Sequence, residues 1–190
     1  GNTIVNFWNT SILELNNSLL YTNYFFYDRS AIVLNGNISL EANNTFTMQG
    51  NSKMYFKDNI NITFGSSSKI KFTGFSQLLG NDLIIKAGDN YLFEGSSEIV
   101  ATNLIVKSGS NLRFTTSGIC NVQDKLEVES DAEIYLCSLN VSNLILKPGS
   151  IVNFNQGSSK ITGDFLAEGI VNNRITLNIP FNNGFNIQTN

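Results

Sequence analysis

One spacing recurs along almost the whole chain and constrains its fold more than any other feature. A pair of apolar residues separated by one position, such as Leu83 and Ile85, is followed eight residues after its start by a second pair, Tyr91 and Phe93. Apolar residues that alternate with a period of two predict short β-strands with one buried face. Each unit is therefore expected to be a strand, a tight turn and a second strand.

The spacing predicts eight such units between residue 5 and about residue 162. Their first strands begin at Val5, Tyr24, Phe46, Ile62, Leu83, Leu104, Leu126 and Leu144. In the last four units, the fifth residue after the start is of a type that accepts positive φ at a corner, namely Gly88, Gly109, Asp131 and Gly149. A unit that begins at Ile38 and continues at Phe46 obeys the same offset, but it leaves the preceding coil too short, so we place the start at Phe46.

These units predict an all-β fold, a parallel β-helix (β-solenoid) of about eight triangular coils of roughly 20 residues. The starts lie 16 to 22 residues apart, which is too short for a crossover helix and favours coils stacked into parallel sheets. A further apolar cluster in each coil, such as Leu78-Leu79 or Ile99-Val100, predicts the third face. The alternative is an antiparallel sandwich or an up-and-down barrel, whose hairpins do not require one offset to recur.

The whole chain, residues 1–190, fits a single domain, because 42% hydrophobic and 14% charged residues allow a sizeable core. Residues 163–190 keep a strand-like alternation at Ile175, Leu177 and Ile179 but lose the repeat, so we expect an irregular final coil or a cap. Since the chain begins with Gly1 rather than Met, we expect it to be a processed form or part of a larger protein.

One position of the coil is expected to form an inward ladder of large side chains. Stacked coils bring equivalent positions into line at a spacing of about 4.8 Å. The residues at this position are Phe72, Phe93, Phe114, Leu136 and Phe154. We interpret the ladder as core packing.

Charge and residue types exclude several classes of function. The net charge is -3 and no run of Lys or Arg occurs, so neither nucleic acid nor an anionic membrane surface is an expected partner. No apolar stretch approaches the roughly 18 residues of a membrane span. The chain contains no His, which removes Ser-His-Asp and Cys-His catalysis and the commonest metal ligand. We expect no cofactor and no metal ion.

Two carboxylates could still carry acid-base chemistry without histidine. Glu127 and Glu129 are expected on the outward side of one strand, about 7 Å apart by strand geometry. This separation is compatible with a polysaccharide lyase or hydrolase, or with a loosely held calcium ion. The alternative is structural, because Glu129 takes the coil position of Lys107 before it and Lys147 after it, which predicts an exposed Lys-Glu-Lys ladder.

Two other residue types bear on the compartment. Cys120 and Cys137 are seventeen residues apart, nearly one coil, so a disulfide that clamps neighbouring coils and a pair of free thiols are both compatible with the sequence. A disulfide would indicate an oxidising compartment. The candidate glycosylation sites, about as many as chance would produce, are Asn9, Asn16, Asn37, Asn43, Asn61 and Asn140.

The outward side of the first strands is apolar, whereas that of the second strands is polar. A sheet face that meets water is expected to be polar, so the exception predicts an interaction face. The alternative is scattered exposed apolar residues, which proteins tolerate singly. Trp8 with Tyr21, Phe25 and Tyr27 could also stack on sugar rings. The predicted interaction face consists of Trp8, Phe25, Tyr27, Ile84, Ile105 and Ile145.

The alternation Leu-x-Val-x-x-Gly-Ser-x-Leu-x-Phe at residues 104–114, with a variant at residues 144–154, resembles the parallel β-helix repeats of secreted adhesins and autotransporter-type passengers. The resemblance covers most of the chain. It implies an extracellular or cell-surface protein that acts as a stalk, an adhesin or a structural element. Similar repeats occur in pectate-lyase-type enzymes, but their catalytic signature is not found in this sequence.

We therefore expect a non-enzymatic structural or adhesive β-solenoid module that acts through its surface and can self-assemble. Its expected partner is another protein chain, a second copy of itself or a carbohydrate surface. The alternative function is carbohydrate binding or polysaccharide degradation by surface carboxylates and aromatic residues.

Overall fold

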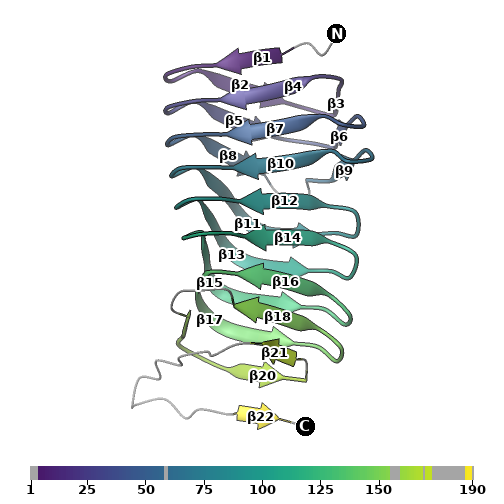
Figure 1. Ribbon diagram of the computed structural model, residues 1–190, viewed down its shortest axis with the longest axis vertical. Helices are drawn as coiled ribbons and strands as arrows, with labels where there is room; N and C mark the ends of the chain where they lie inside the picture. Colours follow the sequence, from purple (N-terminus) through teal and green to yellow (C-terminus); the bar gives the residue numbers. More distant parts are fainter. Residues whose placement is uncertain (1–3, 58–59, 155–158, 169, 173–186, 190) are drawn as a thin grey trace.

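The computed structural model describes residues 4–57, 60–154, 159–168, 170–172 and 187–189. In this part of the chain every regular element is a β-strand, and the strands stack in parallel as a β-solenoid of about eight turns spaced roughly 21 residues apart (Figure 1). The all-β solenoid expected from the sequence is thus confirmed. No helix in the described residues could span a membrane.

Two long parallel sheets and one short parallel sheet run along the axis of the solenoid. The first sheet contains β1 (Ile4–Phe7), β4 (Asn23–Phe26), β7 (Thr45–Met48), β10 (Lys69–Phe72), β12 (Asn90–Phe93), β14 (Asn111–Phe114), β16 (Glu133–Leu136), β18 (Ile151–Phe154) and β21 (Ile170–Asn172). The second sheet contains β2 (Ile12–Leu15), β5 (Ala31–Leu34), β8 (Lys53–Phe56), β11 (Gln77–Ile85), β13 (Glu98–Val106), β15 (Ile119–Val128), β17 (Ser138–Leu146), β20 (Phe165–Ala167) and β22 (Ile187–Thr189), with β19 (Ser159–Ile161) paired to β17. The third sheet contains β3 (Ser18–Leu20), β6 (Ile38–Leu40) and β9 (Ile62–Phe64).

Two corners of the coil are built from residues with positive φ, stacked coil upon coil. The corner that leads into the first sheet contains the predicted turn residues Gly88, Gly109, Asp131 and Gly149, with φ between 59° and 85°. The corner that leaves the first sheet contains Asn9, Asp28, Gly50, Gly74, Gly95 and Thr116. Glycine and short polar residues accept this left-handed conformation most readily, which is why the sequence reveals these corners.

The core contains a column of large side chains stacked from coil to coil. The ring centroids of Phe72 and Phe93 lie 4.5 Å apart and those of Phe93 and Phe114 lie 4.6 Å apart, in nearly parallel planes. All three side chains are fully buried. The predicted ladder is therefore confirmed, and strand register extends it to the first coil. The column runs through Phe7, Phe26, Met48, Phe72, Phe93, Phe114, Leu136 and Phe154.

The predicted frame is wrong for the first three coils. Their predicted units begin in the first sheet, with β1, β4 and β7, whereas the later units begin with β9 or with the second half of β11, β13, β15 and β17. Both corners that flank the first sheet separate equivalent strand positions by eight residues, so the offset cannot distinguish one corner from the other. The frame set aside above, Ile38 followed by Phe46, is the one that matches the later units, because β6 pairs with β9.

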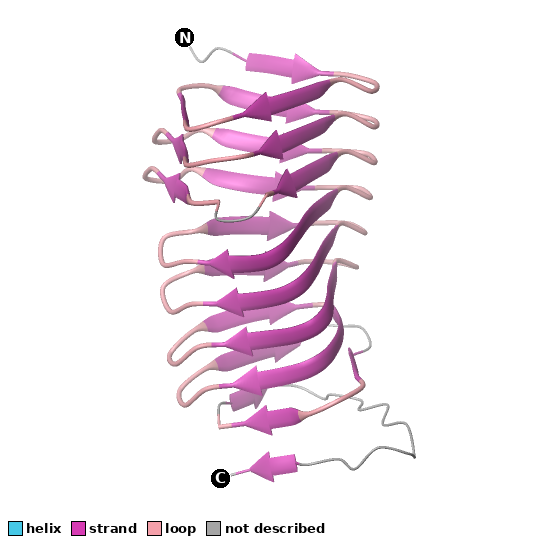
Figure 2. Cartoon of the chain, turned by 180° about the vertical axis from the view of Figure 1, so that it is seen from behind, coloured by secondary structure: helices cyan, strands magenta, loops and turns pink. Residues whose placement is uncertain are grey.

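The third face of the coil is built in two ways. In the first three coils the strand of the second sheet ends after four residues, and a separate strand of three residues forms the third sheet. In the next four coils, β11, β13, β15 and β17 are nine or ten residues long and run round the corner without a turn (Figure 2). The bend in β13 is visible in its burial, because Ile99 and Ala101 face the core, Thr102 and Asn103 both face outward, and Leu104 faces the core again.

The two arrangements meet between β9 and the second half of β11, at a place that we call the seam. Across the seam the described strands do not pair, since β9 pairs with β6 and the second half of β11 pairs with β13. Side chains bridge it instead. Lys86 Nζ donates to Asn61 Oδ1 at 2.6 Å, and the rings of Phe64 and Tyr91 meet edge to face with centroids 5.3 Å apart.

The last part of the chain keeps to the stack where it is described. Strand β20 pairs with β17, β21 pairs with β18, and β22 pairs with β20. The first and second sheets therefore continue beyond residue 163. The alternation predicted at Ile175, Leu177 and Ile179 lies outside the described residues.

Candidate functional surface

The predicted interaction face is divided between two surfaces. Phe25 is a residue of β4 in the first sheet, and Trp8 and Tyr27 follow β1 and β4 at the adjoining corner. Ile84 and its two equivalents belong to the second half of the long strands of the second sheet. The prediction of one continuous face was wrong for the same reason as the predicted frame, because it assigned strands from different sheets to one coil position.

Ile84, Ile105 and Ile145 do lie in one row along the axis, which we call the isoleucine row. Ile84 pairs with Ile105, and Glu127 pairs with both Ile105 and Ile145. Leu166 continues the row beyond Ile145. Ile84 is 42% exposed and the other apolar members are half-buried. A groove of about 600 Å³ lies along the row. Leu166 extends the apolar surface of the row, and Glu127 interrupts it once.

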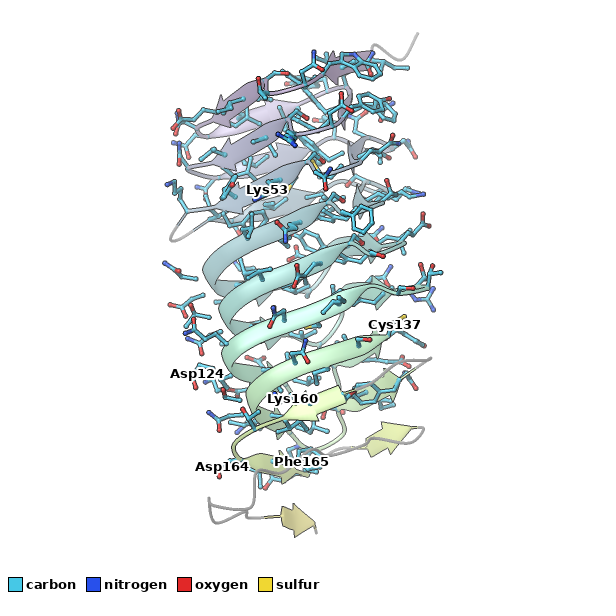
Figure 3. The ribbon with its side chains drawn as sticks, turned by 90° about the vertical axis from the view of Figure 1, so that its left-hand side faces the viewer. Lys53, Asp124, Cys137, Lys160, Asp164 and Phe165 are labelled. Carbon is cyan, nitrogen blue, oxygen red and sulfur yellow. The ribbon has the colours of Figure 1, made fainter. Side chains whose placement is uncertain are left out.

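The bend of the long strands carries a row of acidic and amide side chains at one edge of this groove. We call it the corner row, and it consists of Asp82, Asn103, Asp124, Asn143 and Asp164. Asn103 Nδ2 donates to Asp82 Oδ1 at 2.7 Å, and Asn143 Nδ2 donates to Asp124 Oδ1 at 3.0 Å. Asp124 and Asp164 lie along the same edge of the solenoid in Figure 3. The amides separate the carboxylates, which reduces repulsion between like charges in neighbouring coils.

A second groove, of about 750 Å³, lies on the other side of the corner row. Its lining comes from the outward face of the first halves of β11, β13 and β15 and from the end of β8. We call it the amide groove. The side chains that matter for its chemistry are Tyr55, Leu79, Val100, Asn81, Thr102 and Gln123. This groove could not be predicted from the sequence, because it depends on which outward residues the bend brings together.

The two candidate catalytic carboxylates each lie beside lysine. Lys107 Nζ lies 2.9 Å from Glu129 Oε1, as the structural alternative predicted. Glu127 Oε2 lies 3.1 Å from Lys125 Nζ, and its Oε1 lies 3.9 Å from Lys147 Nζ. The predicted Lys-Glu-Lys ladder is therefore only half correct, since Lys147 pairs with Glu127. Among the described residues, no group of three or more His, Cys, Asp or Glu side chains could hold a metal ion.

The aromatic residues near the first coil stack on one another. The ring of Trp8 lies nearly parallel to that of Tyr27, with centroids 4.0 Å apart, and Phe25 lies 6.2 Å from Tyr27. Trp8 remains 55% exposed. Tyr21 lies before β4, whereas Tyr27 lies after it, so Tyr21 is not part of this cluster. The predicted platform of four aromatic residues thus contains three.

Cys120 and Cys137 are both buried and are free thiols. Cys120 pairs with Leu139 in the second sheet, whereas Cys137 immediately precedes β17 and lies opposite the residue before β15, so the two are out of register. Cys137 Sγ donates to the carbonyl of Phe114 at 3.4 Å. Burial raises the pKa of Cys120 to about 12 and also raises the pKa of Cys137. Of the two alternatives, the structure has the pair of free thiols, and both are inert core residues.

Most of the candidate glycosylation sites are accessible. Asn61 is half-buried, and its Oδ1 accepts the hydrogen bond from Lys86 across the seam. The exposed sites are Asn9, Asn16, Asn37, Asn43 and Asn140. Glycosylation remains a prediction, and Asn61 is the least suited of the six to carry a glycan.

One buried acid was missed in the sequence. Asp89 is only 5% exposed, and its Oδ2 accepts a hydrogen bond from Lys86 N at 2.6 Å. Burial raises the pKa of Asp89 to about 6. Ser68 and Ser110, at the same coil position, each donate to a backbone carbonyl at 2.7 Å. The signal was the carboxylate at a position that neighbouring coils fill with serine.

Comparison of the chain with protein-family models, with curated proteins and with solved structures finds no match. The resemblance to adhesin and passenger repeats therefore remains one of repeat pattern and architecture, and fold alone does not imply function.

Proposed function

We propose that the chain is a non-enzymatic structural or adhesive module, extracellular or on a cell surface, that acts through the outer face formed by the second halves of its long strands. The observation that carries this proposal is the isoleucine row. The residues of the row occupy one position in successive coils, and strand pairing aligns them across several neighbouring strands. An apolar row on a rigid rod, even one interrupted by a single carboxylate, offers a binding surface for another protein chain or a second copy of this one.

The energetics favour covering the row. Burial of apolar surface contributes roughly 25 cal/mol per Å², and an uncovered row gains none of it. The outward residues beside the row are charged or amide side chains of the corner row, which suits a contact with an apolar centre and a polar rim. Self-assembly would join two copies through this face.

The test replaces the centre of the row by charge. The variant Ile84→Lys/Ile105→Lys should reduce the mass measured by sedimentation velocity, or abolish binding to the native partner, while the circular dichroism spectrum stays unchanged. The matched control is Leu79→Lys/Val100→Lys, because Leu79 and Val100 are paired in the same two strands on the other side of the bend. If the parent is a dispersed monomer without a partner and the row variant behaves like it, the row has no role in assembly.

Assays of polysaccharide cleavage by the parent and by two carboxylate variants distinguish the non-enzymatic proposal from the enzymatic alternative. Cleavage of a polysaccharide that is lost in Glu127→Gln or Glu129→Gln would contradict the non-enzymatic proposal. We expect both variants to behave as the parent, because each carboxylate has a lysine partner within 4 Å.

A further inference from the structure

The amide groove differs from the isoleucine row in both shape and chemistry. Its volume of about 750 Å³ is within the range of small-molecule sites. Leu79 and Val100 form an apolar floor, because they pair in neighbouring strands and their side chains face outward. Tyr55 pairs with Leu79 and is 36% exposed, so an aromatic ring continues the floor. A flat apolar ligand surface can rest on these three side chains.

The wall beside this floor is made of uncharged polar side chains. Asn81, Thr102 and Gln123 lie at the start of the bend in three successive coils. Within the described part of the chain, their side chains have no hydrogen-bond partner. An amide offers both donors and an acceptor, and a hydroxyl does the same, so this wall matches a ligand whose groups also donate and accept. Among the described residues that line the groove, Lys57 is the one that carries a charge.

These features together select a class of ligand. A sugar ring has an apolar face of C–H groups and a rim of hydroxyls, which fits a floor of apolar and aromatic side chains beside a wall of amides and hydroxyls. An acidic sugar would need basic side chains along the wall, whereas in the described lining the wall residues Asn81, Thr102 and Gln123 are uncharged, and the cations Lys57 and Lys160 lie apart from one another, in the amide groove and in the smaller groove beyond it. The neutral wall therefore favours an uncharged glycan.

The groove also continues along the axis of the solenoid. A smaller groove of about 360 Å³ shares Asn121 and Gln123 with it and extends over Asn140, Ser142, Thr162 and one cation, Lys160. Equivalent positions in successive coils are spaced by about 4.8 Å, and the apolar floor of Tyr55, Leu79 and Val100 is followed along the face by the polar residues Asn121 and Asn140. We propose that the amide groove binds an extended chain of a neutral glycan, laid along the axis across β11, β13 and β15. This inference goes beyond the proposed function, because it concerns another face and another class of partner.

The experiment measures binding of the unglycosylated chain to soluble mixed-linkage β-glucan, galactomannan and linear xylan by affinity electrophoresis and calorimetry. We expect at least one of these to bind, and polygalacturonate not to bind. Asn81→Ala/Gln123→Ala should weaken that binding about tenfold or more, because it removes two sets of hydrogen-bonding groups. Tyr55→Ala should weaken it by a similar factor through lost stacking.

The lysine variants of the two surfaces serve as reciprocal controls. Leu79→Lys/Val100→Lys should abolish glycan binding, whereas Ile84→Lys/Ile105→Lys should leave it unchanged, each with a parent-like circular dichroism spectrum. The proposal is overturned if none of the neutral glycans binds, if polygalacturonate alone binds, or if the amide-groove variants bind as the parent does. Loss of assembly in the isoleucine-row variant with glycan binding intact would separate the two surfaces.

Discussion

The first three coils and the four coils that follow fill the same core but turn one corner differently. In the first three, the strand of the second sheet ends before a separate short strand begins, and in the first coil Asn17, with φ of 45°, lies in the turn between them. In the next four, the strand continues through the bend, with consecutive outward residues such as Thr102 and Asn103 at its vertex. The later coils therefore pair with one another through single strands of nine or ten residues, where the earlier coils pair through two short strands.

The difference explains where the candidate surfaces lie. A strand that runs through the bend keeps its outward residues in register on both sides of it, although the pairing of β15 with β13 and with β17 shifts within the bend itself. The isoleucine row, the corner row and the amide groove therefore all form over β11, β13, β15 and β17. A turn at the same place would remove that register. The seam marks the boundary, since β9 and the second half of β11 do not pair.

The largest expected effect tests the core column that both regions share. Phe93 is fully buried between Phe72 and Phe114, whereas Phe7 is half-buried and has the ring of Phe26 on one side. Phe93→Ala should lower the free energy of unfolding by about 3–5 kcal/mol. Phe7→Ala should cost roughly half as much, because less apolar surface is lost and no enclosed cavity forms.

Urea unfolding followed by circular dichroism measures both losses. Phe75→Ala is the control for a phenylalanine outside the column, since Phe75 is 66% exposed, and its effect should stay within about 0.5 kcal/mol. Equal losses for Phe7→Ala and Phe93→Ala would show that the first coil is buried in solution and that the two regions do not differ in this respect.

Much of this fold could be predicted from the sequence, for identifiable physical reasons. The turns at Gly88 and Gly109 are recognisable because their backbone has positive φ, which glycine adopts most readily. The inward ladder through Phe93 follows from the alternation of apolar residues with a period of two. The frame could not be predicted, because two corners have the same length and only strand pairing shows that β6 lies beside β9. Local spacing does not contain that information.

The candidate surfaces were less predictable than the fold. The apolar character of Ile84 and Ile105 was visible, but joining them with Trp8 required the wrong frame. The amide groove was missed because Asn81 and Thr102 resemble ordinary surface residues until the bend places them beside Leu79 and Val100. At a bend two successive residues face outward, and this shifts the inward-outward alternation of every residue that follows. The sequence pattern does not mark where that shift occurs.

The next effect concerns the first coil after the seam, where Asp89 replaces the serine of its neighbours. Burial raises the pKa of Asp89 to about 6 from the ordinary value of 3.8, so the folded state holds the proton more tightly than the unfolded chain does. Stability should therefore be greatest below about pH 4 for this group and should fall as the pH rises to about 6. The loss is about 2–3 kcal/mol.

Asp89→Ser copies the residue found in the coils on either side, and it should flatten this part of the pH profile and raise stability at pH 8. Thermal unfolding between pH 3.5 and pH 8 measures the change. Glu41→Ser, at an exposed carboxylate in the first region, is the matched control and should leave the profile as it is in the parent. A variant at Asp89 that keeps the full decline would mean that another buried group causes it.

The smallest effect tests whether surface charge, rather than strand continuity, distinguishes the two regions. The ion pairs found among the described residues all lie between Lys71 and Lys147, beyond the third sheet. Lys107 and Glu129 are well placed at 2.9 Å, but their side chains are 42% and 36% exposed. A double-mutant cycle with Lys107→Ala and Glu129→Ala should give a coupling of about 0.2–1 kcal/mol that disappears in 1 M salt, because water screens exposed pairs. The difference between Phe7→Ala and Phe93→Ala should survive the same salt, since buried apolar contacts do not depend on charge. A coupling above about 2 kcal/mol, or a difference between the two phenylalanine variants that vanishes in salt, would assign the contrast between the regions to electrostatics and not to the strands that run through the bend.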